Sequence, residues 1–413
     1  MNGIDSVFVF LSTVLVFIMT PALALFYGGM VRSKNVLSTT MHSYAMFAIV
    51  SVQWVAVGYS LAFGNNLDGL LGSLIGGGQY AFMNGVGFDP SSVYGTTIPH
   101  SLFFMFQLMF AIITPALISG GFAERIKFKS FLVFIILWCF LVYDPIAHWV
   151  WGANGWLYKL GALDFAGGNV VHISSGVTAL VAALVLGKRK NKSSARPHNI
   201  PLTILGAGIL VFGWYGFNAG SALAFNGVAM NAFITTNTAA ACGMIGWVAF
   251  EWIRTKKPTA LGAVSGIVAG LVAITPAAGF VNVQGSMAIG LLGGTICYFA
   301  VSILKKKFGY DDALDAFGCH GIGGTVGGLA TGLFATVSVN AAGADGFFYS
   351  GNFSLLGKQA IAIIVTYALA GGISFILLKV IDKVMGLRSS EEAEATGLDV
   401  ADHGEEAYSG IAS

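Results

Sequence analysis

The sequence predicts an all-α polytopic membrane protein with eleven transmembrane helices, and three observations carry this prediction. Of the 413 residues, 56% are hydrophobic and only 10% are charged, whereas a soluble domain carries about 25% charged residues. The apolar residues form runs of the ~20 residues that one bilayer crossing needs. The Lys and Arg residues gather in alternate connections between these runs, as the positive-inside bias of membrane proteins requires.

The predicted helices follow one another along nearly the whole chain. They cover residues 5–30, 40–62, 99–122, 130–149, 164–187, 201–224, 231–254, 259–277, 286–304, 313–336 and 358–384. The first run has no Lys or Arg before Val7 and is too long for the apolar region of a signal peptide, so we expect it to remain as a helix. The longest outer connection, residues 62–99, contains no Lys or Arg.

The basic residues predict the orientation. One side carries Arg32, Lys34, Arg125, Lys127, Lys129, Lys188, Arg189, Lys190, Lys192, Arg196, Arg254, Lys256, Lys257, Lys305, Lys306, Lys307, Lys379, Lys383 and Arg388, while only Lys159 and Lys358 fall on the other. This bias places the N-terminus outside and the C-terminus in the cytoplasm, which needs an odd number of spans. We therefore expect a transmembrane domain over residues 1–386. The acidic residues 387–413 then form a cytoplasmic tail, which we expect to be solvated.

Helices one to five and six to ten form two halves, and because five is odd, the second half is inverted relative to the first. The eleventh helix follows both halves. Inverted repeats place a transport pathway between the halves, near the bilayer midplane. We expect Gly262, Gly266 and Gly270, and likewise Gly324, Gly328 and Gly332, to form small faces that let helices approach closely.

Two histidines occupy matching places in the two halves. His172 and His320 each follow an Ala-Leu-Asp tripeptide, and each lies in an apolar, glycine-rich run. At 1.5 Å per residue, His172 lies about 12 Å from the outer end of helix five, and His320 lies about 12 Å from the inner end of helix ten. In a core of about 30 Å their levels differ by only about 6 Å. A single buried His is more often satisfied by a helix carbonyl, but a matched pair favours a functional site, and we expect the two rings to be adjacent.

Four acidic residues lie at the ends of predicted helices. Asp164 and Asp315 stand where helices five and ten begin, so we expect both to be N-caps. Asp164 can also stabilise an arriving cation. Glu124 and Glu251 lie where apolar runs meet basic loops, and we expect both to form ion pairs there.

Composition and motifs exclude several other classes of function. Nothing indicates nucleic-acid binding, and the four single cysteines lack the spacing of a metal site. The glycine-rich residues 321–328 lack a preceding strand and a Walker lysine, so they are not a phosphate loop. No nucleophile or HExxH motif accompanies the histidines, which disfavours an enzyme. We expect no cofactor and no metal.

The remaining chemistry favours a substrate that can lose its charge. The predicted pathway contains aromatic residues and two imidazoles but no ring of carboxylates. A potassium ion would have to shed its water with no carbonyls to replace it, so a simple cation channel is disfavoured. A small cation that can give up a proton and cross as a neutral molecule does not meet this barrier.

Six stretches resemble the ammonium transporter family of Amt, Mep and Rhesus proteins, most closely its bacterial Amt members. They are FYGGMVRSKN (26–35), GFAERI (121–126), IAHWVWG (146–152), GALDFAGGNVVH (161–172), GWYGFNAGS (213–221) and FGCHG (317–321). The resemblance implies a homotrimer in the plasma membrane with one pore per subunit, and methylammonium as a substrate analogue. It also implies that a PII-type regulatory protein contacts the tail. Asp144 and Tyr215 are departures, and one role open to Asp144 is to add negative charge near the outer end of helix four.

The same resemblance assigns roles to residues of this chain. His172 and His320 line the pore, and Asp164 supports the deprotonation of ammonium. Trp151 and Ser221 bind the cation at the outer mouth, with Phe106 and Trp214 near the same vestibule, and Phe110 and Phe217 stack as a gate. Phe110 also contributes to binding. Two alternatives remain: an electroneutral ammonia or carbon dioxide channel of the Rhesus type, and an ammonium sensor that signals through the tail.

Overall fold

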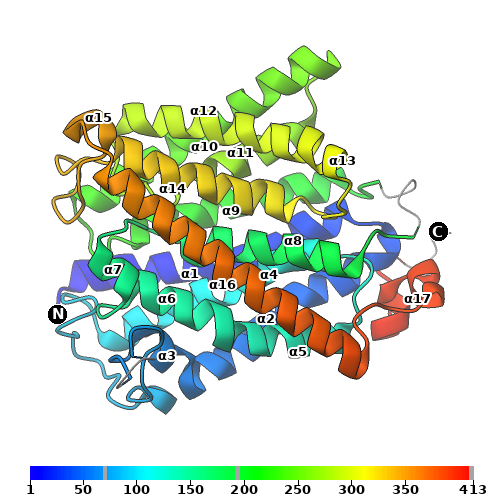
Figure 1. Ribbon diagram of the computed structural model, residues 1–413, viewed down its shortest axis with the longest axis horizontal. Coiled ribbons are helices and arrows are strands. Elements are labelled where there is room, and N and C mark those ends of the chain that lie inside the picture. Colours follow the sequence, from blue (N-terminus) through cyan, green and yellow to red (C-terminus); the bar gives the residue numbers. More distant parts are fainter. Residues whose placement is uncertain (68–71, 191–195, 409–413) are drawn as a thin grey trace.

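The structure is a computed structural model that describes residues 1–67, 72–190 and 196–408. Every named element in these ranges is helical, and β-pairing there is limited to three isolated bridges. Lys192, part of the connection 62–99 and residues 409–413 of the predicted tail lie outside the described residues. The helices run roughly parallel to one axis, and the N-terminus and helix α17 of the tail lie at opposite ends of the bundle (Figure 1).

The described chain contains eleven helical stretches that can cross a membrane, as predicted. Nine are long and apolar enough by themselves, and α11 and residues 317–334 complete the set. The first five stretches are α1 (Gly3–Met30); Ser33–Phe63 with α2 (Val36–Gln53) and α3 (Tyr59–Phe63); α4 (His100–Phe122); Phe128–Leu160 with α5 (Phe128–Trp138), α6 (Asp144–Trp151) and α7 (Trp156–Leu160); and Gly168–Leu186 with α8 (Ser174–Leu186). The next five are α9 (Ile200–Gly220); α10 (Gly227–Thr255); α11 (Ala260–Ile274); Val283–Phe308 with α12 (Val283–Phe299) and α13 (Lys305–Phe308); and 317–334 with α14 (Ile322–Phe334). The last is α16 (Ser354–Met385). Two short helices, α15 (Phe347–Ser350) and α17 (Glu391–Thr396), lie outside these stretches.

Several predicted boundaries move for identifiable reasons. Helix five begins at Gly168 rather than at Asp164, because the Asp164 side chain caps it. Helix ten begins at Phe317, because Asp315 has a φ of +59° and interrupts the chain before it. Left-handed backbone of this kind cannot continue a right-handed helix.

Both histidines lie in short π-helical turns that precede regular helix. His172 belongs to the turn Gly168–Ile173, and His320 belongs to the turn Phe317–Gly321. Such turns are rare and occur mostly at functional sites. Gly176, one turn after His172, lies against the helix of His320: a β-carbon there would come within 2.1 Å of the Gly321 nitrogen. The two helices can therefore approach closely only because glycine stands at this contact.

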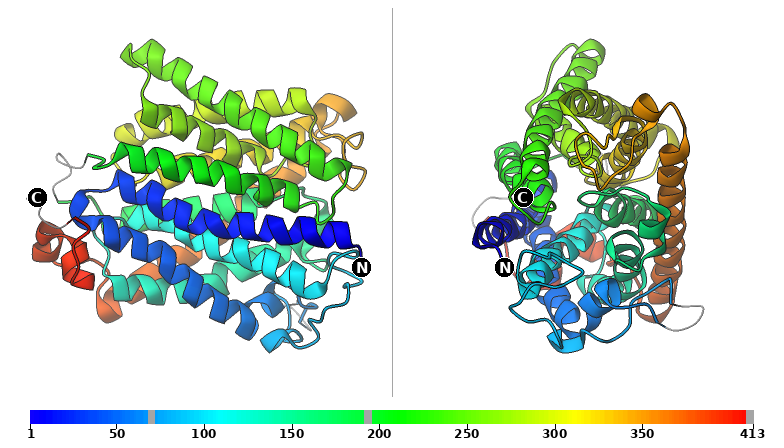
Figure 2. Two further views of the ribbon diagram at one scale, coloured as in Figure 1. Left: turned by 180° about the vertical axis from the view of Figure 1, so that it is seen from behind. Right: turned by 90° about the vertical axis from the view of Figure 1, so that its left-hand side faces the viewer.

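The final helix, α16, packs diagonally across both halves of the chain. It contacts α5 and α8 of the first half and α14 of the second half. Figure 2 shows it along one side of the bundle, away from α1 and α2. The helix therefore ties the two halves together on one face.

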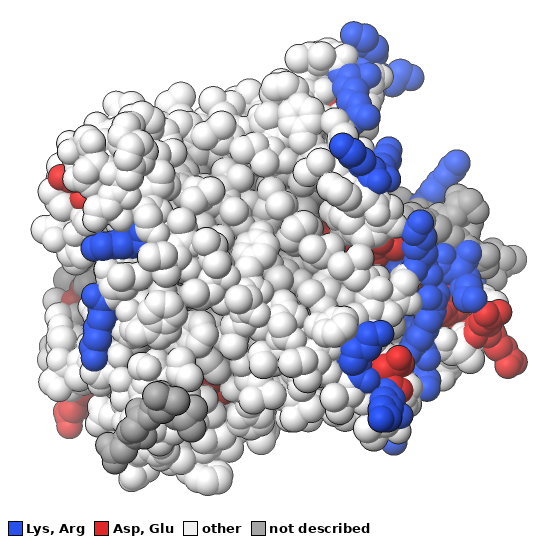
Figure 3. Space-filling view, viewed as in Figure 1, with Lys and Arg blue, Asp and Glu red and all other residues white. Residues whose placement is uncertain are grey.

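The charged side chains are concentrated at one end of the molecule. Most of the visible Lys and Arg side chains in Figure 3 gather at the end that carries α13 and α17, and few lie at the opposite end. We call the first end the basic end. The predicted gathering of basic residues on one side is therefore present in the fold.

The tail is packed against the basic end through several buried residues and exposes others, so the prediction of a solvated tail is wrong for the buried part. Leu387, Leu398 and Asp399 are at most 1% exposed. Asn35 accepts a hydrogen bond from the backbone of Leu398, and Asp399 accepts one from the backbone of Ser38 at the start of α2. The acidic segment is not fully solvated because its leucines are buried and because Asp399 finds a backbone N–H partner at the start of α2.

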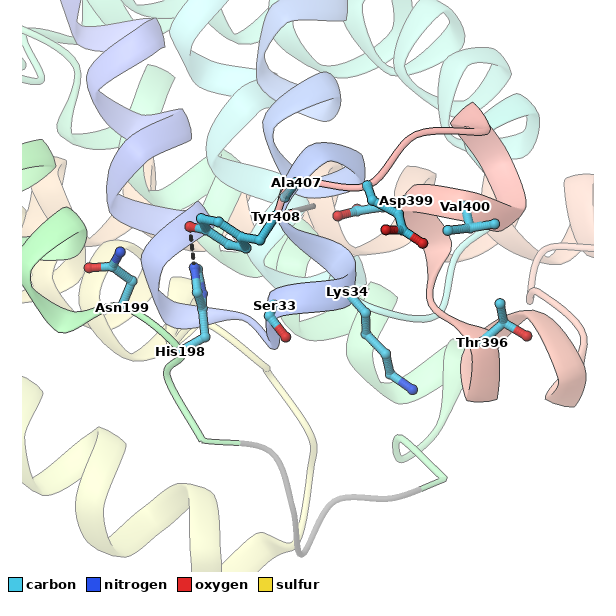
Figure 4. A pocket seen from close by; sticks show the side chains of 10 residues that line it. Ser33, Lys34, His198, Asn199, Thr396, Asp399, Val400, Ala407 and Tyr408 are labelled. Atoms are coloured by element: carbon cyan, nitrogen blue, oxygen red, sulfur yellow. Dashed lines mark hydrogen bonds between the residues drawn. The ribbon is translucent and has the colours of Figure 1, made fainter. Parts of the chain in front are cut away.

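A cavity of about 450 Å³ remains between the tail and the ends of α1 and α9 (Figure 4). Its walls include Lys34, Asn199 and Thr396. The hydroxyl of Tyr408 and the Nε2 atom of His198 lie 2.8 Å apart at its rim. The far part of the tail is therefore attached to the start of α9 as well.

A cluster of charged residues joins four segments of the basic end. Glu124 pairs with Arg32 and Arg189, each at 2.9 Å. Asp311 pairs with Arg125 at 3.1 Å and with Arg189 at 2.9 Å. The expected ion pairing of Glu124 is confirmed. Glu251 was predicted wrongly, because it accepts hydrogen bonds from the backbone and hydroxyl of Thr259 and has no ion-pair partner among the described residues.

Candidate functional site

The two histidine rings are adjacent and buried between the halves of the chain. Their Nδ1 atoms lie 3.3 Å apart, their ring centroids are separated by 5.3 Å, and the rings are inclined by 22°. His172 is 1% exposed and His320 is 5% exposed. The expected adjacency is confirmed, and it brings together residues that are 148 positions apart in the sequence.

Thr275 fixes the direction of the hydrogen bonds in this pair. Its hydroxyl donates its one hydrogen to the carbonyl of Leu271 at 2.8 Å, so it can only accept from other groups. It accepts from the indole of Trp214 at 3.0 Å and lies 3.3 Å from Nε2 of His172. His172 therefore carries its hydrogen on Nε2, and its Nδ1 atom accepts from Nδ1 of His320. In this arrangement both imidazoles are neutral.

Sequence reasoning did not single out Thr275. The only signal is its place before Pro276, where the apolar run of α11 ends. Trp214 was expected near the outer vestibule, and this placement is wrong. Its ring is stacked 5.5 Å from His172, on the histidine side of the Phe110–Phe217 pair.

A second cavity, of about 160 Å³, lies next to the start of α4 and is lined mainly by aromatic rings. We call it the aromatic cavity. Phe106, Phe110, Trp151 and Ser221 line it, as expected for neighbouring residues of one vestibule. Gln107 lines it too, and its amide oxygen has no hydrogen-bond partner among the described residues, which sequence reasoning missed.

Phe110 and Phe217 separate the aromatic cavity from the histidines. Their ring centroids lie 4.3 Å apart. Phe110 lines the aromatic cavity, whereas Phe217 lines a cavity of about 20 Å³ beside His172 and His320, which we call the histidine cavity. The contacting rings therefore lie between the aromatic cavity and the histidine cavity.

Polar contacts hold the two predicted binding residues in place. The hydroxyl of Ser221 donates to the carbonyl of Phe217 at 2.8 Å. The indole of Trp151 donates to the backbone carbonyl of Asp164 at 2.9 Å, and its ring meets that of Phe110 at 90°. The lone pairs of Ser221 and the face of Trp151 are therefore left for other partners.

Asp164 acts as the cap of the helix that carries His172, as predicted. Its Oδ1 atom accepts from the backbone of Gly167 and Gly168, at 2.8 and 2.6 Å. Its Oδ2 atom accepts from Asn169 at 2.7 Å and from Val170 at 3.4 Å. All four hydrogen bonds use the carboxylate as an acceptor. Asp164 is therefore positioned to orient both Trp151 and the turn of His172.

The corresponding prediction for Asp315 is wrong. Asp312 accepts from the backbone of Phe317 at 2.8 Å and caps the second histidine turn. Asp315 instead contacts Lys305 and lines a small cavity on the other side of His320. The positive φ of Asp315 points its backbone away from the helix start, which explains why the earlier aspartate takes the capping role.

Asp144 lies at the middle of the stretch Phe128–Leu160 rather than near its outer end. It is fully buried, and its Oδ2 atom accepts from the side-chain amide of Gln53 at 2.7 Å. It therefore joins α6 to α2 inside the bundle and contributes no charge to the aromatic cavity.

Comparison with known proteins gives consistent results. The sequence profile of the Ammonium Transporter Family matches residues 7–408. The chain is 61% identical to an ammonium transporter of Bacillus subtilis, over 98% of each chain. It is 48% identical to ammonium transporter Amt1 of Archaeoglobus fulgidus, over 96% of this chain and 97% of that one.

Solved structures resemble the fold over nearly its full length. The crystal structure of Saccharomyces cerevisiae Mep2 matches with a TM-score of 0.88 and 38% identity, covering 95% of this chain and 88% of that one. A sensor Amt protein matches with a TM-score of 0.87 and 30% identity, covering 97% and 98% of the two chains.

Proposed function

This chain belongs to the ammonium transporter family and is a multi-pass membrane protein that transports ammonium, and from this premise we propose how its residues carry out transport. The aromatic cavity recruits NH4+, the cation gives up a proton to the histidine pair as it leaves this cavity, and NH3 passes Phe110 and Phe217 and then the two histidines. The proton follows through the histidine pair. The observation that supports this mechanism best is the contact of two buried imidazoles beside a small, mostly apolar cavity.

Recruitment rests on the aromatic faces and on two oxygen acceptors. A cation held over Trp151 and Phe110 gains about 0.5–2 kcal/mol from their π-systems. Ser221 has already donated its hydrogen to Phe217, so its oxygen can accept an N–H of ammonium. The amide oxygen of Gln107 provides a second acceptor. The site therefore offers partners for a small cation with several N–H groups.

Passage favours a neutral molecule, because the histidine cavity is small and mostly apolar. Its volume of about 20 Å³ exceeds the ~10–15 Å³ that one water molecule needs. One ammonia molecule fits this space, whereas a hydrated ion does not. Beside the imidazoles the cavity is lined by apolar side chains such as Leu23, Val171 and Phe217. A cation there would have no ring of oxygens to replace its water.

Replacing Trp151 by leucine tests the recruitment step. We expect the KM for methylammonium uptake into proteoliposomes to rise about 2- to 30-fold, which is the range that corresponds to a lost cation–π contact. Ser221→Ala should raise the KM as well, because one acceptor is lost. Phe88→Leu is a matched control, since Phe88 is 85% exposed and lines no described cavity of the pathway. An unchanged KM in both site variants would contradict the proposed outer site.

The direction and setting of transport are part of the same proposal. We place the aromatic cavity on the outside of the plasma membrane and the basic end in the cytoplasm, because Lys and Arg favour the cytoplasmic side. Residues 1–386 then form the transport domain, and residues 387–413 form the cytoplasmic tail. Labelling of a cysteine introduced near the N-terminus by a membrane-impermeant reagent in intact cells tests this orientation.

We propose two protein partners. The chain assembles as a homotrimer, which is consistent with the many large apolar side chains exposed on its helices, such as Phe212, Ile245 and Trp252. Native mass spectrometry measures this state directly. A PII-type protein binds the basic end, where the packed tail lies against α2 and most of the visible Lys and Arg side chains gather. Loss of PII retention after deletion of residues 387–413 would support this contact, and unchanged retention would contradict it.

Two other modes of action are distinguished by measurement. An electroneutral channel of the Rhesus type would show uptake without current when ammonium is added to reconstituted protein. The relay proposed here predicts an inward current.

A signalling role is the second alternative, because the fold resembles that of a sensor Amt protein. A tail-deleted variant that still transports favours the transporter.

A further inference from the structure

One residue of the aromatic cavity has a strained backbone that its neighbours hold in place. Leu223 has a φ of +56°, and of the six described non-glycine residues with positive φ it is the one that lines the aromatic cavity. A bulky residue in this region of φ/ψ space is a genuine outlier. Strain of this kind persists only where the surroundings impose it, and it is concentrated at binding sites.

The contacts around Leu223 account for its positive φ. It lies in the short connection between α9 and α10, two residues after Ser221, and its backbone N–H donates to the carbonyl of Gly220 at 2.8 Å. Two residues later, the backbone of Phe225 donates to Asp5 of α1 at 2.9 Å, and the Phe225 ring packs 5.4 Å from that of Phe8. The connection is therefore anchored on both sides of Leu223, and the leucine cannot relax without breaking these contacts.

We propose that Leu223 is a specificity-determining residue that forms an apolar wall of the ammonium site, an inference that rests on the function proposed above. The cavity offers ammonium the aromatic faces and the oxygens of Ser221 and Gln107. A leucine beside Ser221 excludes water and supplies no oxygen. Ammonium tolerates this because its N–H groups need only a few acceptors. A potassium ion needs several oxygens to replace its water and does not find them.

Two substitutions separate the apolar side chain from the backbone conformation. Asparagine is close to leucine in size and tolerates positive φ, so Leu223→Asn keeps the shape of the connection but places an amide in the cavity. Glycine also adopts this φ without strain, and Leu223→Gly removes the side chain altogether. We expect both variants to retain the wild-type thermal stability or exceed it, which shows that the connection is intact.

The test is methylammonium uptake by reconstituted protein with increasing external potassium. We expect the KM for methylammonium to rise about tenfold in Leu223→Asn and Leu223→Gly, and potassium to become a competitive inhibitor of both. Ser221→Ala and Trp151→Leu are measured in parallel. If these two raise the KM while the Leu223 variants match the wild type in KM and in potassium resistance, the inference for Leu223 is wrong and the proposed site stands. If none of the four variants differs from the wild type, both proposals are overturned.

Discussion

Replacing Asp164 by alanine is expected to abolish ammonium uptake and to lower the stability of the protein by several kcal/mol. The carboxylate accepts four backbone hydrogen bonds at the start of the His172 helix. A hydrogen bond to a charged group contributes about 1.5–3 kcal/mol, and a buried donor left without a partner costs about 1–3 kcal/mol. Without the cap, the turn that carries His172 and the carbonyl that orients Trp151 both lose their support.

Asp164→Asn gives a graded comparison. Asparagine keeps one acceptor oxygen, so it can hold one pair of the N–H groups, while its amide nitrogen faces the other pair. We expect its melting temperature and uptake rate to lie between those of the wild type and the alanine variant. Both are measured on purified protein, by thermal unfolding in detergent and by methylammonium uptake into proteoliposomes. An alanine variant with wild-type stability and uptake would show that the cap is dispensable.

Replacing Asp311 by alanine is expected to destabilise the protein by roughly 3–5 kcal/mol. Asp311 is the partner of Arg125, and the side chains of both are fully buried. Its removal leaves a buried guanidinium without its carboxylate and also removes the contact to Arg189. Thermal or denaturant unfolding in detergent measures the loss. Glu391→Ala is the matched control, because its pair with Lys190 is exposed and an exposed pair contributes about 0–1 kcal/mol.

The same cluster predicts a loss of stability in acid. Burial alone would raise the pKa of Asp311 and of Glu124, but hydrogen bonds and charges from Arg189, Arg125 and Arg32 hold both values below normal. Carboxyl groups with a lowered pKa in the folded state stabilise it above their ordinary values of about 4, and this contribution is lost as the pH falls through the folded values. Asp311→Ala should therefore show a weaker acid dependence than the wild type. An identical pH profile would contradict this assignment.

The sequence predicts the spans and the meeting of the histidines because both follow from regular geometry. Apolar length gives the eleven crossings, and the rise per residue places His172 and His320 at similar depth from opposite ends. The predicted capping role of Asp164 is also present, although the helix begins four residues later, because its carboxylate reaches the free N–H groups of that helix start.

Other features of the fold and of the candidate site depend on contacts between distant residues, which no local sequence pattern reveals. The π-helical turns at Gly168–Ile173 and Phe317–Gly321 follow from packing between helices, as the contact of Gly176 with Gly321 illustrates. Whether Asp312 or Asp315 caps a helix is decided by one backbone angle. Thr275 is a single threonine in an apolar run, and its role is visible only from the three groups around its hydroxyl.

The acidic tail illustrates a second limit. Its composition is typical of a solvated segment, yet Leu398 is buried and Asp399 binds the start of α2. Both contacts depend on partners more than 350 positions earlier in the chain. Composition describes the segment alone and cannot report a surface that receives it.

The exclusion of charged species at the histidines is tested most directly by recording potassium and ammonium currents from the reconstituted variants His172→Asp and His320→Glu, together with methylammonium uptake. An anionic carboxylate in the histidine cavity supplies the oxygens and the charge that a desolvated cation lacks there. We predict that each variant conducts potassium, which the wild type excludes, and that its uptake rate changes. If both variants still exclude potassium and transport methylammonium at the wild-type rate, the two histidines do not select the species that crosses.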